Sequence, residues 1–130
     1  MVNILLVSHS HQIVKSVYEF MLEMKNNDFM FDYVGGIENG KHFGTNPMEI
    51  QEKITNMTKD RELVIIYDLG SSLMNTEVAL QLVGKEIAEK TQIITCAFLE
   101  GTLVAISSNN SDINAKQMKE LVELQCKINK

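Results

Sequence analysis

The sequence has little of what marks secreted, membrane-spanning or multidomain proteins. Its 130 residues include one proline, two cysteines and no tryptophan, and no linker, repeat or biased tract divides them. The apolar run at the N-terminus is only about six residues long, without a basic flank or a small-residue cleavage site, so we expect neither a signal peptide nor a membrane span. We therefore expect one cytoplasmic domain over residues 1–130.

Basic side chains are also scarce. The chain carries 12 lysines and arginines against 17 acidic residues, which gives a formal net charge of −5. No cluster of basic residues offsets this balance, and binding to a phosphate backbone needs such a cluster. We expect no nucleic-acid partner.

The cysteines and histidines are too few and too scattered for a metal site. Cys96 lies in an apolar, strand-like segment and Cys126 in the last helical pattern, and neither has metal-type spacing or a secretory context. Three histidines without a second carboxylate at ligand spacing do not complete a metal centre. We expect free, unreactive thiols, no disulfide and no bound metal.

Alternating patterns predict a layered α/β fold. Short apolar runs that favour strands lie at 2–7, 29–34, 63–67 and 92–97. Patterns with helical spacing lie at 13–24, 46–57, 73–88 and 113–126. The nearly unbroken runs at 2–7 and 63–67 are typical of strands buried on both faces. We predict a doubly wound, mainly parallel sheet of four strands in the order 2-1-3-4, with helices on both faces.

Some boundaries are less clear. Asn46 is the expected N-cap of the helix that follows it, and either Ser111 or Asp112 is expected to cap the last helix. Between residues 98 and 108 the Glu100-Gly101 pair looks like a turn before another apolar run, so local propensity favours a hairpin there.

His9 is the first candidate for chemistry. It follows the first strand and precedes a helix, between Ser8 and Ser10. In open α/β sheets, ligands bind at the carboxyl ends of the strands, beside helix N-termini that attract anions. His9 is thus placed where a phosphate would be held, and its neutral imidazole is a competent nucleophile toward phosphorus. Ser10 is a candidate phosphate ligand.

Asp68 is the expected partner of this histidine. It follows the third strand, so its carboxylate can accept a hydrogen bond from one ring nitrogen of His9 and leave the other nitrogen to attack. Three residues just after it, Gly70, Ser71 and Ser72, offer N–H groups and hydroxyls as an anion nest. Thr45, after Gly44, offers a further phosphate-binding loop.

Ordinary structural roles remain open for all of these residues. His9 can be a polar turn residue, and Asp68 can cap the helix that follows it. Ser71 and Ser72 are common N-cap residues, a role that is compatible with phosphate binding.

Four segments resemble a known family: 4–10, 44–47, 68–75 and 99–101, which read ILLVSHS, GTNP, DLGSSLMN and LEG. They are similar to the phosphotransfer subunit of phosphotransferase-system-dependent dihydroxyacetone kinase, which is itself similar to the IIA domains of mannose-type sugar transporters. The resemblance implies a mannose-type IIA fold, with a helix rather than a hairpin at 99–106, and a homodimer.

The resemblance also implies a function. His9 would take a phosphoryl group from the carrier protein HPr and pass it to ADP on a separate nucleotide-binding kinase subunit. This subunit would be a phosphotransferase that binds no cofactor of its own. No Gly-x-x-x-x-Gly-Lys-Ser loop or magnesium-binding carboxylate cluster is visible in the sequence, which agrees with a relay rather than an ATP-using kinase.

Two other functions stay open. One is the IIA component of a mannose-type transporter, although that family usually carries Gly-Gly-Ser-Pro where this chain has Gly-Ser-Ser-Leu at 70–73. The other is a receiver-like signalling domain with Asp68 as the phosphate acceptor. A receiver needs an acidic pair after the first strand to hold magnesium, and Ser8 and His9 stand there instead.

Overall fold

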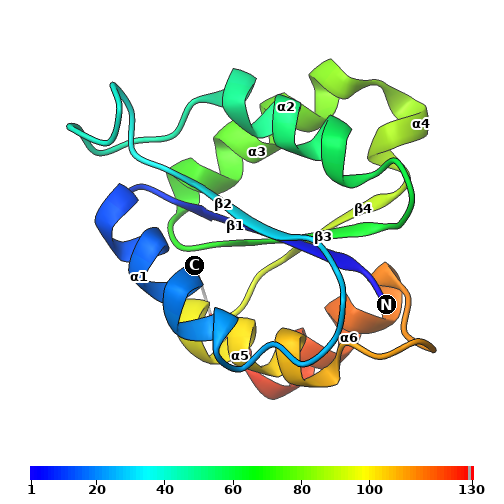
Figure 1. Ribbon diagram of the computed structural model, residues 1–130. Helices are drawn as coiled ribbons and strands as arrows, with labels where there is room; N and C mark the ends of the chain where they lie inside the picture. Colours follow the sequence, from blue (N-terminus) through cyan, green and yellow to red (C-terminus); the bar gives the residue numbers. More distant parts are fainter. Residues whose placement is uncertain (129) are drawn as a thin grey trace.

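A computed structural model describes residues 1–128 and 130 of the chain. Its centre is a four-stranded sheet in which all the paired strands are parallel and the order is β2-β1-β3-β4 (Figure 1). The strands are β1 (Asn3–Ser8), β2 (Phe31–Gly35), β3 (Leu63–Tyr67) and β4 (Thr91–Ile94). The predicted fold class and strand order are confirmed.

Helices cover both faces of the sheet (Figure 1). One face carries α2 (Pro47–Met57), α3 (Gly70–Val83) and the short α4 (Lys85–Ala88). The other carries α1 (His11–Leu22), α5 (Phe98–Ser108) and α6 (Ala115–Gln125). None of the helices in the described part of the chain is both long and apolar enough to cross a bilayer.

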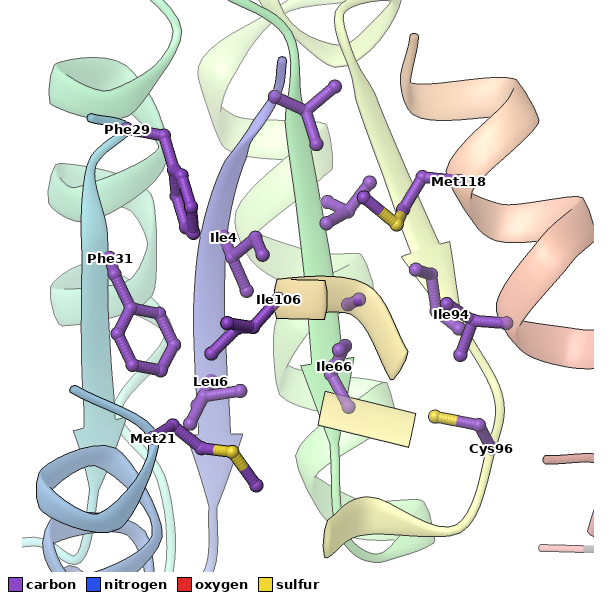
Figure 2. Close-up of a cluster of buried hydrophobic side chains, with 14 of the residues drawn as sticks. Ile4, Leu6, Met21, Phe29, Phe31, Ile66, Ile94, Cys96, Ile106 and Met118 are labelled. Atoms are coloured by element: carbon purple, nitrogen blue, oxygen red, sulfur yellow. The ribbon is translucent and has the colours of Figure 1, made fainter. Parts of the chain in front are cut away.

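Two apolar layers hold the helices to the sheet. Alternate residues of β1 point to opposite faces, so Ile4 and Leu6 join the layer under α1, α5 and α6, drawn in Figure 2. Leu5 and Val7 join the layer under α2 and α3. Every residue of β1 is buried because both of its faces are covered, which explains the unbroken apolar run in the sequence.

The segment at 99–106 is part of helix α5, so the hairpin favoured by local propensity is wrong and the helix implied by the family is correct. Gly101, which looked like a turn residue, is buried within α5 against Cys96, in the segment that joins β4 to α5. A Cβ atom at this position would lie 2.1 Å from Cys96 Sγ. The glycine permits a close approach of the helix to this segment and does not mark a turn.

Helix boundaries were predicted less well than helix existence. Asn46 caps α2 as expected, since its side chain accepts a hydrogen bond from Met48 N. The last helix begins later than predicted: Asn114, not Ser111 or Asp112, is its N-cap, in a capping box with Gln117.

The helix predicted at 73–88 is really two helices. It starts early, at Gly70, and Gly84 separates α3 from α4. Gly84 has a φ of 91°, a left-handed conformation that ends the first helix. The early start is what matters for the site, because it places residues 70–72 in the first turn of α3.

Candidate active site

The register of the sheet brings His9 and Asp68 together. β1 and β3 are parallel neighbours with Val7 opposite Tyr67, so the residues after each strand leave the same edge side by side. The backbone continues this pairing, because Asp68 N donates to Val7 O over 3.2 Å. His9 lies just before α1 and Asp68 just before α3.

The Asp68 carboxylate accepts four donors. Ser8 Oγ donates to Oδ2 over 2.7 Å, and Ser72 Oγ donates to Oδ1 over 2.9 Å. The backbone N–H groups of His9 and Leu69 also donate to it, the first at 3.2 to 3.3 Å and the second at 2.7 Å. An ionised carboxylate has about four acceptor positions, so this set fits an anion that is held rigidly in place.

The His9 ring lies between two serine hydroxyls. Ser71 Oγ is 2.8 Å from Nε2, and Ser72 Oγ is 3.3 Å from Nδ1. The predicted direct hydrogen bond to Asp68 is not formed, because Nδ1 and Asp68 Oδ1 are 3.9 Å apart. The side chain of His9 is 25% exposed, so the ring has a path to solvent.

The N-terminus of α3 faces the same point. Its N-cap, Leu69, makes no side-chain capping bond. The N–H groups of Gly70 and Ser71 have no hydrogen-bond acceptor within the described residues. Together with the positive end of the helix dipole, these free donors favour an anion beside His9 Nε2.

Ser10 has a structural role in this structure. Its hydroxyl accepts a hydrogen bond from Ile13 N over 3.2 Å and so caps α1, and its own N–H donates to Ser8 Oγ over 3.1 Å. The cap uses an oxygen lone pair and leaves the hydroxyl proton free. Its role as a phosphate ligand stays a prediction.

Thr45 is held near the site by a contact that sequence reasoning missed. Gly44 N donates to His9 O over 2.7 Å, which places the loop beside the histidine backbone. Asn75 Nδ2 donates to Thr45 O at 3.1 Å and to Thr45 Oγ1 at 2.5 Å. Asn75 lies four residues after Ser71 in α3, and this spacing is the sequence signal that both side chains lie on the same face of the helix.

Lys130 is a second unexpected neighbour. Its ammonium group donates to Tyr67 O and lies 4.3 Å from the centre of the Tyr67 ring, at the end of β3. Partial desolvation lowers the pKa of Lys130, while the negative charges of Cys96 in its thiolate form and of Asp68 act in the opposite direction. No sequence pattern pointed to this lysine.

The described residues contain no group of three or more histidine, cysteine, aspartate or glutamate side chains that could hold a metal ion. The candidate site consists of His9, the hydrogen-bond cluster around Asp68 and the N–H groups of Gly70 and Ser71.

Comparison with known proteins identifies the family. The protein-family model described as "EIIA-man: PTS system fructose IIA component" matches residues 3–119 of this chain. The chain belongs to the EIIA-man family. One relative is a Listeria innocua protein named "PEP-dependent dihydroxyacetone kinase 2, phosphoryl donor subunit DhaM". It is 35% identical to this chain over 81% of this chain and 83% of its own length. The DhaM phosphotransferase subunit of Lactococcus lactis is 28% identical over 92% of each chain.

Longer relatives match over one part only. The DhaM subunit of Escherichia coli is 32% identical over 83% of this EIIA-man chain, which spans 23% of that protein. Among solved structures, the protein of unknown function EF1359 superposes with a TM-score of 0.84 at 25% identity, over 95% of this chain and 93% of that one. A phosphotransferase system component EIIA from Streptococcus agalactiae shares the fold, with a TM-score of 0.70 at 15% identity over 95% and 91% of the two chains.

Proposed function

We propose that this EIIA-man domain is the phosphoryl donor subunit of a dihydroxyacetone kinase and works as a phosphohistidine relay. His9 accepts a phosphoryl group from HPr and transfers it to ADP on the nucleotide-binding kinase subunit. The observation that carries the proposal is the position of the His9 ring, whose side chain is 25% exposed and whose Nε2 lies 2.8 Å from Ser71 Oγ in the first turn of α3. The names of relatives at 25 to 35% identity supply the kinase.

The first transfer uses His9 Nε2 as the nucleophile. Its lone pair attacks the phosphorus of phospho-HPr, a new N–P bond forms, and the N–P bond of the donor breaks with its electron pair returning to the donor imidazole. In the second transfer a terminal oxygen of ADP attacks the same phosphorus. The His9 bond then breaks, ATP forms, and the lone pair returns to Nε2.

The surroundings of His9 provide stabilisation without a metal in this subunit. The phosphoryl oxygens would face the N–H groups of Gly70 and Ser71, with the Ser71 hydroxyl as a further donor. Thr45 lies in the loop that contacts the histidine backbone and is a further candidate donor. Because the nucleotide is held by the partner, this subunit needs no cofactor of its own.

The proposal includes a symmetric dimer. Met74, Val78 and Leu82 follow one another at four-residue spacing along α3, and they are 67%, 44% and 50% exposed. This spacing places all three on one face of the helix, and a contiguous exposed apolar face favours association. Sedimentation at micromolar concentration tests this, and a single species at 14.7 kDa would refute it.

A transfer experiment tests the function. The protein is labelled with ³²P through the general carrier enzymes and mixed either with an ADP-loaded nucleotide-binding kinase subunit or with the IIB domain of a mannose-type transporter. We expect loss of label from His9 and ATP on the kinase subunit. Transfer to the IIB domain alone would instead assign the chain to sugar uptake, and absence of any label on the protein would reject the relay.

A further inference from the structure

We propose that Ser72 is a positioning residue through which Asp68 fixes the tautomer of His9. This inference rests on the proposed function in that His9 is taken as the nucleophile. It differs from the expectation that Ser72 binds phosphate and that Asp68 holds the ring directly.

The donor and acceptor groups of Ser72 determine the direction of the two hydrogen bonds that link His9 to Asp68. A serine hydroxyl has one proton and two acceptor lone pairs. Ser72 donates that proton to Asp68 Oδ1 over 2.9 Å, so toward His9 Nδ1, 3.3 Å away, it can only accept. The ring must then carry its proton on Nδ1. Asp68 cannot hold this proton directly, because the distance of 3.9 Å from Nδ1 to Asp68 Oδ1 is too long for a hydrogen bond.

The fold holds the Ser72 hydroxyl in one place. Ser72 is fully buried, and its N–H bonds to Leu69 O over 3.0 Å in the first turn of α3. Its carbonyl accepts a hydrogen bond from Thr76 Oγ1 over 2.7 Å. A buried hydroxyl with a fixed donor direction is well suited to orient a neighbouring ring.

The neighbouring serine has the opposite environment. Ser71 is exposed, and its hydroxyl lies 2.8 Å from Nε2 and 3.4 Å from Nδ1. If Nδ1 holds the ring proton, Nε2 carries a lone pair, and Ser71 donates to it in the resting state. The Ser71 hydroxyl must move aside when phosphorus approaches, and its exposure allows this. Because Ser71 contacts both ring nitrogens, Ser71→Ala is not a neutral control. The control for the same substitution is Ser107→Ala, which removes a hydroxyl that donates to Leu103 O within α5.

Removal of the Ser72 hydroxyl should release the tautomer. In Ser72→Ala the Nδ1 proton loses its acceptor, and the ring shifts toward the form protonated on Nε2, which histidine prefers in water. That form has no lone pair at the open face and cannot attack. Because a mixture still contains rings with a bare Nε2, we expect transfer to slow only in proportion to the fraction of rings that lose this tautomer, and by less than in Asp68→Ala, which also removes the carboxylate charge.

The decisive measurement is ¹⁵N NMR of the His9 ring in the unphosphorylated protein, at a pH where the ring is neutral. The wild type and Ser107→Ala should show a protonated Nδ1 and a bare Nε2, and Ser72→Ala should show a mixture. Ser72→Cys keeps the side-chain shape with a weak hydrogen-bonding group, and it gives the same test if the alanine variant is poorly folded. A protonated Nδ1 retained in the Ser72 variants would overturn the inference.

The double variant Ser72→Ala/Asp68→Ala adds a kinetic test. If Asp68 acts through Ser72, the double variant transfers no more slowly than the slower single variant. If the slowing of transfer in the double variant equals the product of the slowing in the two single variants, Asp68 acts on the ring independently of Ser72, and the inference is overturned. The NMR result needs no phosphoryl donor, so failure of His9 to accept phosphate would reject the relay while leaving the tautomer result to be judged separately.

Discussion

Polar side chains are buried at both ends of the sheet, but they are used differently. At the amino end of β1, Asn109 Oδ1 accepts from Val2 N over 2.9 Å and its Nδ2 donates to Val2 O over 2.8 Å. Asn3 bonds to Met57 O and Met30 N, both at 2.9 Å. These amides are buried and bond only to backbone groups, so they join segments that are distant in the sequence.

At the carboxyl end of the sheet, a series of hydrogen-bonded side chains ends at a partly exposed residue. Buried Ser8 and Ser72 both donate to Asp68, and the cluster continues from Ser72 to the partly exposed ring of His9. The difference teaches that a buried polar residue is not by itself a functional sign. What distinguishes the proposed active end is a histidine ring that contacts a buried serine and is itself partly exposed.

The largest expected effect comes from His9→Ala. We expect complete loss of acid-labile phosphate because the only proposed acceptor is gone. The free energy of unfolding should fall by only about 1 kcal/mol, since the backbone N–H of residue 9 still donates to Asp68 in this variant. Site mapping after labelling checks this, and label kept at full stoichiometry in a folded variant contradicts the assignment.

The opposite result is expected at the amino end. Asn109→Ala leaves the N–H and C=O of buried Val2 without partners, each at a cost of about 1 to 3 kcal/mol, so stability should fall by about 2 to 6 kcal/mol. Urea unfolding measures the loss, with the exposed neighbour Asn110→Ala as a control that should cost far less. In the folded fraction, phosphate labelling should match the wild type. Loss of phosphate labelling in folded Asn109→Ala would show that the amino end of the sheet also contributes to function, contrary to the difference argued between the two ends.

Cys96 tests whether position at the carboxyl edge is enough for reactivity. It follows β4 at this edge, but it is fully buried, and burial raises its pKa to about 11 from a usual 9.0. The unfolded chain loses this thiol proton first. The protonated thiol therefore contributes its full stabilisation below about pH 9. The free energy of unfolding then falls by about 2 kcal/mol as the pH rises toward 11.

Unfolding titrations from pH 8 to 11 measure this loss, and Cys96→Ala should lack that part of the pH dependence. Near neutral pH, a maleimide should react with Cys126, which is only partly buried, well before Cys96. Fast labelling of Cys96 in the native protein would show that the edge is more open than the structure indicates.

Much of the fold was visible in the sequence because burial on both faces leaves a plain signature. The unbroken apolar runs of β1 and β3, and the helix patterns between strands, predicted the sheet and its order. Gly101 was misread because a turn and a close packing contact use the same residue, and only the distance to Cys96 distinguishes them. Helix starts were misjudged at Asn114 and Gly70 because caps depend on local geometry.

The site was predicted in its components but not in its connections. Strand ends placed His9 and Asp68 together because parallel neighbours end at one edge. The bridge through Ser72 was not foreseen, since it depends on α3 starting three residues earlier than the apolar pattern suggested. The four-residue spacing from Ser71 indicates the helix face of Asn75 but not its contact with Thr45, 30 residues away. No local pattern encodes the contact of Lys130 with Tyr67, 63 residues away.

The smallest expected effect, in Ser10→Ala, asks where the site ends and the scaffold begins. Loss of the cap on α1 should cost about 1 kcal/mol, because Ile13 N loses its acceptor in the first turn of the helix. If the hydroxyl proton binds no phosphate, the transfer rate should stay within about threefold of the wild type, a change of less than 1 kcal/mol in the barrier. Ser10→Asp is a poor control, since its charge would repel phosphate. Ser10→Asn can restore the cap without a hydroxyl, and normal stability with normal transfer in that variant would assign Ser10 to the scaffold. Slow transfer in both variants, despite the restored stability of the second, would show that the hydroxyl contacts the phosphoryl group after all.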